Sequence, residues 1–224
     1  MNDKPESIKV VLLGESGVGK KSLISQFTVN KFDPHRETSL SAHFASKTLD
    51  FPDLGQSIKL DIWDTVGQEK YRSLAKIFYK DAKVIIFVYD ITREFSFESI
   101  KNYWYKETKE NWEGTPILAL VGNKIDLYSE IKVSNKEGMA FAEEIGAIFQ
   151  FTSAESNFGI TNLFENILKT YLFTGFDYRY WDKKAQEDFM KKKQEENKKE
   201  KKKREIRGMK LDQKETKKKK GKFC

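Results

Sequence analysis

The sequence predicts an α/β fold: a mostly parallel sheet with one antiparallel edge and helices on both faces, followed by a charged C-terminal tail. Short apolar runs alternate with segments of helical spacing, which is typical of a parallel sheet covered by helices. A Pro/Asp/Gly turn at 52–55 joins two of these runs and predicts a hairpin, which supplies the antiparallel edge. Such sheets bind ligands beyond the carboxyl ends of their strands, so residues that follow a strand are the first candidates for a site.

Each element is predicted from its local pattern. Continuous apolar runs, rich in β-branched residues at 84–89, predict buried strands, and apolar residues at helical spacing, as over 95–111, predict helices. The expected elements in chain order are strand 8–13, helix 20–29, strands 42–50, 58–63 and 84–89, helix 95–111, strand 117–122, helix 136–145, strand 148–151 and helix 160–173.

Charge is distributed unevenly along the chain. The 224 residues carry a net charge of +7, yet residues 182–224 alone hold 19 Lys/Arg and 9 Asp/Glu, a net of +10. The other 22 basic and 25 acidic residues leave 1–181 at −3, so nucleic acid is not an expected partner of the folded part. We expect a flexible N-terminus at 1–6, one domain at 7–173 and a Lys/Glu-rich tail at 174–224 that is partly helical or disordered.

Cysteine usage and hydropathy favour a cytoplasmic setting. Cys224 is the one cysteine, so no intrachain disulfide can form, which fits a reducing compartment. No run of about 18 apolar residues exists to span a membrane. The polar N-terminus resembles neither a secretory signal nor a myristoylation site.

A phosphate-binding loop follows the first strand. Residues 14–20 read Gly-Glu-Ser-Gly-Val-Gly-Lys, and G-x-x-x-x-G-K between a strand and a helix is the P-loop pattern of the P-loop NTPase fold. Its N–H groups and the helix N-terminus face the phosphates, and Lys20 supplies a positive charge. The alternative is a chance glycine-rich turn. The predicted phosphate-binding residues are Gly14, Ser16, Gly17, Val18, Gly19, Lys20, Lys21 and Ser22.

Lys21 departs from this pattern, which continues with Ser or Thr as a ligand of Mg²⁺. An ammonium group cannot ligate a cation and repels one nearby. At about 4 Å two unit charges interact by about 4 kcal/mol at an effective dielectric of about 20, and by about twice that when one ion is divalent. Either Lys21 turns to solvent and Mg²⁺ keeps more water ligands, or its charge partly replaces that of the metal. Both arrangements weaken metal binding.

Asn-Lys-Ile-Asp at 123–126 follows an expected strand and is similar to the guanine-binding motif of Ras-family GTPases. The Asp126 carboxylate can accept hydrogen bonds from both the N1–H and the exocyclic amine of guanine. Adenine offers no such pair and would leave the carboxylate unpaired. The resemblance implies that Asn123, Lys124 and Asp126 bind the base. Taken alone, the four residues are also typical of a loop with a capping residue.

Thr-Ser-Ala at 152–154, after the last strand, resembles the second base-contacting loop of this family. A lysine commonly follows in the family, but here Glu155 takes its place. We therefore expect contacts to the base from the backbone of Ser153 and Ala154.

Trp-Asp-Thr-Val-Gly-Gln-Glu at 63–69 resembles switch II of the same family. The resemblance implies that Asp64 steadies the Mg²⁺ hydration shell, that the Gly67 N–H senses the γ-phosphate and that Gln68 orients the attacking water. Val66 stands where the family has alanine, and its bulk would hinder Gly67 or slow hydrolysis. A simple polar turn after a strand is the alternative.

Switch I is implied between Phe32 and Phe44. Phe32 stands where the family places an aromatic ring edge-on against the base, and Ser-Leu-Ser-Ala-His-Phe at 39–44 resembles the pattern Thr-Ile-Gly-x-x-Phe. Ser39 keeps the hydroxyl that reaches Mg²⁺ and the γ-phosphate, so Ser39 and Asp64 are the expected metal-site residues. The alternative is that Phe32 and Phe44 are core aromatics.

Further segments are similar to the Rab branch of the family, and the resemblance covers residues 6–172. Among them are Tyr-Arg-Ser-Leu at 71–74, Ile-Phe-Tyr-Lys at 77–80 and Tyr-Asp-Ile-Thr at 89–92. The resemblance implies contacts with effector, exchange-factor and activating proteins through 36–44 and 66–80.

Three aromatic residues near these segments, Trp63, Phe78 and Tyr79, have two interpretations. They form either an exposed aromatic patch for protein partners or part of the core.

A Lys-rich run at 217–222 precedes Cys224. Rab proteins usually carry two prenylated cysteines, whereas this chain has one and no C-a-a-X box. A single prenyl chain anchors reversibly, and a polybasic run adds about 1 kcal/mol per basic residue at an anionic leaflet. We expect lipidation of Cys224 and attachment to the cytosolic face of an intracellular membrane. The alternative is an unmodified tail that binds an acidic polymer.

These features predict a Rab-like GTP/GDP switch that recruits effectors in membrane traffic and hydrolyses GTP slowly. Lys21 and Val66 support a second hypothesis, a pseudo-GTPase scaffold with weakened Mg²⁺ and nucleotide binding whose basic tail binds an acidic partner. A P-loop ATPase or kinase does not explain the motif at 123–126. We expect an activating protein to supply a catalytic arginine in trans, because no candidate in cis stands out.

Overall fold

The computed structural model describes residues 6–34, 43–51, 56–65, 78–172 and 199, and the account that follows concerns these residues. The chain divides into two compact units, Met1–Trp181 and Asp182–Cys224. Every strand and helix named below belongs to the first unit, since only the helical residue Lys199 of the second is described. The turn expected at 52–55 and almost all of the tail lie outside the described residues.

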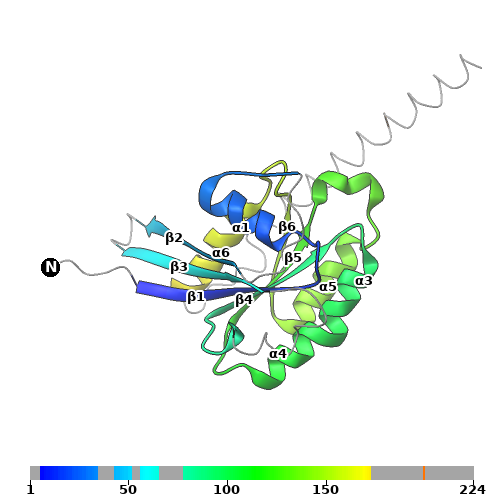
Figure 1. Cartoon of the computed structure of the whole chain (residues 1–224). Helices are drawn as coiled ribbons and strands as arrows, with labels where there is room; N and C mark the ends of the chain where they lie inside the picture. Colours follow the sequence, from blue (N-terminus) through cyan, green and yellow to red (C-terminus); the bar gives the residue numbers. More distant parts are fainter. Residues whose placement is uncertain (1–5, 35–42, 52–55, 66–77, 173–198, 200–224) are drawn as a thin grey trace, which may run out of the picture. The chain divides into compact units, whose positions relative to one another are not determined.

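Six strands form one sheet in the order β2-β3-β1-β4-β5-β6 (Figure 1). Every neighbouring pair is parallel except β2 and β3, which are antiparallel. The predicted fold class is therefore confirmed, and every predicted strand overlaps an observed one. The strands are β1 (Glu6–Leu13), β2 (His43–Phe51), β3 (Gln56–Asp64), β4 (Val84–Asp90), β5 (Ile117–Asn123) and β6 (Ile148–Thr152).

Helices cover both faces of the sheet (Figure 1). On one face, α1 (Lys20–Val29) and α6 (Ile160–Leu172) share a core cluster with the strands. The other face carries α3 (Glu94–Ser99), α4 (Tyr105–Asn111) and α5 (Asn135–Ile145). A π-helical segment, η3 (Ile100–Trp104), joins α3 to α4, and a 3₁₀ helix, η4 (Ile125–Glu130), follows β5. Among the described residues, no helix combines the length and apolarity needed to cross a bilayer.

Strand β4 shows how an apolar run builds this sheet. All of its residues are buried. Alternate side chains of a strand point to opposite faces, so Val84, Ile86 and Val88 join the cluster with α1 and α6. Phe87 and Tyr89 contact rings from the helices of the other face. Burial on both faces explains why this strand is continuously apolar.

The stacked rings of Phe27 and Phe164, with centroids 3.7 Å apart, join α1 to α6. Phe164 is 1% exposed. Phe164→Ala should leave a cavity and lower the free energy of unfolding by about 3–5 kcal/mol, which urea unfolding followed by tryptophan fluorescence would measure. Phe95→Ala in α3 is the matched control: Phe95 is 65% exposed, and its removal should cost less than about 0.5 kcal/mol. Equal losses in the two variants would contradict this core.

Candidate functional site

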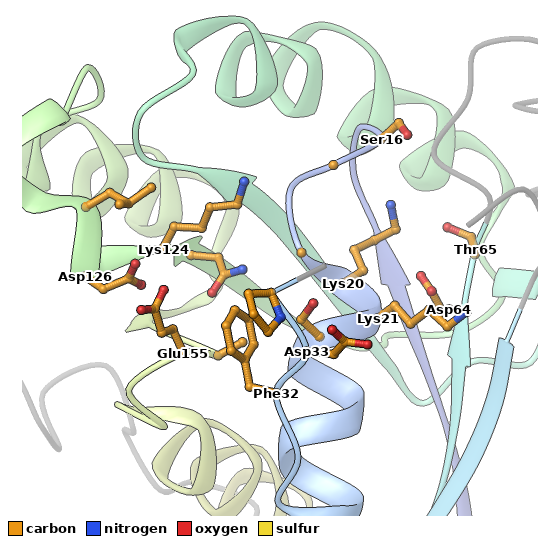
Figure 2. A pocket seen from close by; sticks show the side chains of 17 residues that line it. Ser16, Lys20, Lys21, Phe32, Asp33, Asp64, Thr65, Lys124, Asp126 and Glu155 are labelled. Atoms are coloured by element: carbon orange, nitrogen blue, oxygen red, sulfur yellow. The ribbon is translucent and has the colours of Figure 1, made fainter. Parts of the chain in front are cut away.

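A cavity of about 360 Å³ opens beyond the carboxyl ends of the strands, where open α/β sheets bind their ligands (Figure 2). Twelve of the residues predicted for the site line it: Ser16, Gly17, Gly19, Lys20, Lys21, Ser22, Phe32, Asp64, Asn123, Lys124, Asp126 and Ala154. Asp33, Pro34, Thr65, Leu127 and Glu155 complete the lining.

The remaining predicted residues are placed elsewhere. Gly14 and Val18 belong to the phosphate loop but do not line the cavity, and Val18 is buried in the core. Ser153 is buried as well, and both its backbone N–H and its carbonyl oxygen pair with Phe158. Ser39, Gly67, Gln68 and Cys224 lie outside the described residues.

Two glycines of the phosphate loop are required by close contacts. Gly14 has a φ of 144°, and a Cβ there would lie 2.2 Å from the carbonyl oxygen of Val88 in β4. Gly19 has a φ of 98°, and a Cβ there would lie 2.3 Å from Nδ2 of Asn123. Only glycine lets the loop lie this close to β4 and β5. Because α1 begins directly after Gly19, the first residues of the helix line the cavity.

Lys20 is bound within its own loop. Its ammonium group donates hydrogen bonds to the carbonyl oxygens of Gly14 (2.8 Å) and Glu15 (3.1 Å). Burial lowers the pKa of Lys20, while the carboxylates of Asp64 and Glu15 act in the opposite direction. A buried ammonium beside loop N–H groups is suited to binding an anion.

Lys21 lines the cavity, and the end of its side chain lies next to Asp64 (Figure 2). It is half-buried and lies at the same end of the cavity as Lys20. Burial raises the pKa of Asp64 to about 6, and the charges of Lys20 and Lys21 partly oppose the rise. This position of Lys21 at the phosphate end is compatible with the second arrangement, in which the Lys21 charge partly replaces that of the metal.

The described residues at this end do not fit a Mg²⁺ ion. Mg²⁺ requires near-octahedral oxygen ligands, whereas a lysine ammonium only donates hydrogen bonds. Ser22 is rotated by about 100° around the helix from Lys21, and the Thr65 hydroxyl donates to a backbone carbonyl of β1 at 2.8 Å. Asp64 remains as an expected ligand, and Ser39 lies outside the described residues. Within those residues, no three His, Cys, Asp or Glu side chains gather as a metal site.

The opposite end of the cavity carries exposed carboxylates. Asp126 and Glu155 lie on the far side from Lys20 and Lys21 (Figure 2). Phe32 lines this part of the cavity and packs against the core, so its position is held by the fold.

Lys124 and Asn123 position the base end. The Lys124 ammonium forms a 2.7 Å ion pair with Asp90 at the end of β4. The Asn123 side chain donates to the carbonyl oxygen of Val18 (2.8 Å) and accepts from the Thr152 hydroxyl (3.0 Å). Asn123 therefore ties the phosphate loop to the end of β6.

Glu15 is a residue of the site that the sequence analysis missed. It occupies a variable position of the P-loop pattern, yet it is buried, and its carboxylate accepts from the Ser99 hydroxyl and the Trp104 indole N–H. These donors lie 84 and 89 residues further along the chain. The phosphate loop is thereby attached to α3 and η3, and no local sequence pattern signals this contact.

Arg93 is a second residue that the sequence analysis missed. Its guanidinium Nη1 donates to the carbonyl oxygen of Ser16 at 3.1 Å. No arginine stands out in the sequence as a candidate for catalysis in cis. The structure places Arg93 against the phosphate loop, although outside the lining of the cavity.

Phe44, Trp63 and Phe78 form a continuous group, which we call the aromatic surface. The ring centroids of Phe44 and Trp63 are 4.9 Å apart, and those of Trp63 and Phe78 are 6.0 Å apart. Phe44 is 49% exposed, so it is not a core aromatic. Tyr79, in contrast, is 1% exposed and lies near Glu107 in α4, so of its two interpretations the core position is the observed one.

Comparison with known proteins finds a matching family model and several similar proteins. The Ras family model matches residues 9–173, a span that includes all residues lining the cavity. Ras-related protein Rab-21 of Homo sapiens is 45% identical over 163 residues, which cover 73% of this chain and 71% of that protein. Rab-21 of Geodia cydonium is 44% identical over 164 residues, covering 73% and 70%. Ras-related protein RabC of Dictyostelium discoideum is 38% identical over 161 residues, covering 72% and 82%.

The raised pKa of Asp64 gives the ligand-free protein a pH dependence that can be measured. Its ordinary pKa is 3.8 and its folded value is about 6, so between these values the folded protein binds more protons than the unfolded chain. The free energy of unfolding should therefore fall as the pH rises from about 4 to about 6, by up to about 3 kcal/mol, and level off above. Urea unfolding across this range would measure the fall.

Asp64→Asn should remove this part of the pH dependence. Asp50→Asn, an exposed change that keeps an oxygen for the Ser57 hydroxyl, should leave it in place. If Asp64→Asn has the same profile as the wild type, the assignment to Asp64 is wrong.

Proposed function

We propose the function of this chain from an established premise: it belongs to the Ras family and, within it, to the Rab group of small GTPases. Members of this family are GTPases that bind GTP or GDP together with Mg²⁺. The proposed function is that of a GTP/GDP molecular switch. Its GTP-bound state recruits effector proteins in intracellular membrane traffic.

The observation that carries this proposal is the division of charge within one cavity. Lys20 and Lys21 lie at one end and Asp126 at the other. A guanine nucleotide is complementary, because it has anionic phosphates at one end and a base edge with two adjacent donors at the other. Adenine lacks the donor pair, so it would leave the Asp126 carboxylate unpaired.

The proposed roles of the lining residues follow from their positions. The N–H groups of residues 14–20 and the N-terminus of α1 hold the phosphates, together with the Lys20 ammonium. Phe32 supports the base with its ring, and Ala154 adds a backbone contact. Asn123 keeps the two ends of the site at a constant separation, because both of its side-chain polar atoms are bonded within the protein.

Gln68 is the proposed catalytic residue, since the resemblance to switch II assigns it the orientation of the attacking water. Hydrolysis is slow for two reasons. Val66 adds bulk beside Gly67, and Lys21 replaces a hydroxyl ligand of the metal. Ser39 and Asp64 would be the protein ligands left to a Mg²⁺ ion, so metal binding would be weak.

Lys21 also favours a second candidate function, a pseudo-GTPase scaffold whose basic tail binds an acidic partner. The two candidates differ in the nucleotide that copurifies with the protein. Bound GDP or GTP with measurable turnover supports the switch, and the absence of a guanine nucleotide supports the scaffold.

Effector, exchange-factor and activating proteins are proposed to bind through 36–44 and 66–80. The described parts of these segments contribute Phe44 and Phe78 to the aromatic surface, on either side of Trp63. Phe44 is exposed and Trp63 and Phe78 are half-buried, and aromatic side chains that lie together at a surface in this way favour a protein partner. A catalytic arginine is proposed to come from the activating protein.

The domain at 7–173 is proposed to act at the cytosolic face of an intracellular membrane, to which 174–224 attach it. The net charge of +10 over 182–224 favours an anionic leaflet. A prenyl group on Cys224 would add a hydrophobic anchor.

Asp126→Ala tests the selection of guanine. The change removes an acceptor of two charge-assisted hydrogen bonds, so GTP affinity should fall by about 100-fold or more. Titration with fluorescent GTP and ATP analogues would measure both affinities. Glu130→Ala, an exposed change at the end of η4, is the control and should have wild-type affinity. Equal affinity of the wild type for GTP and ATP would exclude the proposed function.

Cys224→Ser tests the anchor. In cells, this variant should move from the membrane pellet to the supernatant, because the basic residues alone bind an anionic leaflet reversibly. Membrane sedimentation followed by immunoblotting measures the distribution. Met209→Ser in the same tail is the control, and an unchanged pellet fraction for Cys224→Ser would mean that the thiol carries no anchor.

A further inference from the structure

Lys21 is the lining residue that departs from the P-loop pattern, which has Ser or Thr at this position. We propose that its ammonium group takes the place of Mg²⁺ as the counter-charge of the phosphates, so that this chain holds its nucleotide without a metal ion. The inference rests on the proposed function and concerns only what neutralises the phosphates.

The position of Lys21 is the first observation that carries this proposal. It lies in the first turn of α1, two residues after Gly19, and lines the cavity beside Asp64 (Figure 2). Asp64 comes from the end of β3, and its charge attracts the Lys21 ammonium. The fold therefore keeps this positive charge at the phosphate end.

The bonding state of the lining cations is the second observation. Lys20 donates to two loop carbonyls, and Lys124 is paired with Asp90. Within the described residues, no hydrogen bond to the Lys21 ammonium is found. An ammonium group has three donors, so Lys21 can bridge oxygen atoms of a phosphate group without breaking a bond inside the protein.

The charge at the phosphate end supports the same conclusion. Lys20 and Lys21 bring two positive charges to this end, where the Asp64 and Asp33 carboxylates also line the cavity and the Glu15 carboxylate acts on Lys20. A hydroxyl residue at position 21 would remove one positive charge, and a bound ion would have to replace it. Lys21 therefore supplies from the chain a charge that the usual Ser or Thr cannot supply.

Mg²⁺ and the Lys21 ammonium bind oxygen atoms with different geometries, and the less strict geometry of the ammonium is compatible with its attachment to a side chain. Mg²⁺ binds oxygen at about 2.0–2.1 Å in a near-octahedral shell, whereas an ammonium donates at about 2.7–2.9 Å and tolerates many directions. Like charges exclude each other, so the Lys21 ammonium and Mg²⁺ do not share this end of the cavity. Because the ammonium is covalently attached, its local concentration is independent of the free metal concentration.

This arrangement changes how the nucleotide would be released. Removing a metal ion loosens a site that depends on it, but a tethered charge cannot leave by diffusion. An exchange factor would have to displace the Lys21 side chain or the N-terminus of α1. Lys21 thus binds the nucleotide, and nucleotide exchange also depends on this residue.

The test measures GDP affinity and GDP dissociation rate, with a fluorescent GDP analogue, in excess Mg²⁺ and in excess EDTA. The wild-type values should differ by less than about threefold between the two conditions. Lys21→Ser restores the hydroxyl, so its GDP affinity should become at least about tenfold weaker in EDTA than in Mg²⁺. Titration calorimetry of Mg²⁺ into the GDP complexes should detect binding to Lys21→Ser and not to the wild type.

A second variant isolates the charge. Lys21→Met keeps most of the side-chain length, so in EDTA it should bind GDP about 10- to 100-fold more weakly than the wild type, the range expected for one charge-assisted hydrogen bond. Lys83→Met makes the same chemical change at an exposed residue just before the amino end of β4, whereas the cavity lies beyond the carboxyl ends of the strands. It should match the wild type in both conditions.

The outcomes separate this inference from the proposed function. If chelation releases GDP from the wild type as it does from Lys21→Ser, the inference is wrong and the proposed function stands. If the wild type binds no guanine nucleotide in either condition, the proposed function fails. Should a Lys21 variant not fold, the wild-type comparison between Mg²⁺ and EDTA still decides the question.

Discussion

The cavity depends on one buried amide, the side chain of Asn123. It donates to the carbonyl oxygen of Val18 in the phosphate loop and accepts from the Thr152 hydroxyl at the end of β6. The Asn123 backbone carbonyl accepts from the N–H of Ile91 after β4 at 3.1 Å. These bonds hold three strand ends together, and each buried polar group left unpaired would cost about 1–3 kcal/mol. Movement of the phosphate end is therefore coupled to movement of the base end.

Hydrogen bonding within the protein also explains why the phosphate loop presents N–H donors to a ligand. Five of its carbonyl oxygens accept hydrogen bonds from donors of the protein itself: Gly14 and Glu15 from Lys20, Ser16 from Arg93, Val18 from Asn123 and Gly19 from the Leu23 N–H. The Glu15 side chain is attached to α3 and η3 by two further bonds. With these carbonyls engaged, the loop N–H groups remain for an anion. A loop fixed in this way needs little reorganisation when phosphate binds.

The strands and the phosphate loop could be predicted because their tertiary contacts restrict the residue types at each position. β4 is buried on both faces and so is continuously apolar, and Gly14 and Gly19 stand where a Cβ would meet Val88 and Asn123. The side-chain contacts of Glu15 and Arg93 lie at variable positions and leave no such pattern, which is why these two residues were missed. The burial of Tyr79 likewise depends on packing near Glu107 in α4. For Lys21 the sequence left two arrangements open, because it does not show that Asp64 from another strand lies beside the Lys21 side chain.

Two departures from the family pattern act in opposite directions at opposite ends of the cavity. Lys21 adds a positive charge where the pattern has a neutral hydroxyl, and Glu155 places a negative charge where a lysine commonly stands. The phosphate end therefore gains attraction for an anion, while the base end, which already contains Asp126, repels one. A nucleotide that enters with its phosphates toward Glu155 meets repulsion, and the opposite orientation meets Lys20 and Lys21. Charges built into the chain thus orient the ligand, and that orientation does not depend on a bound metal ion.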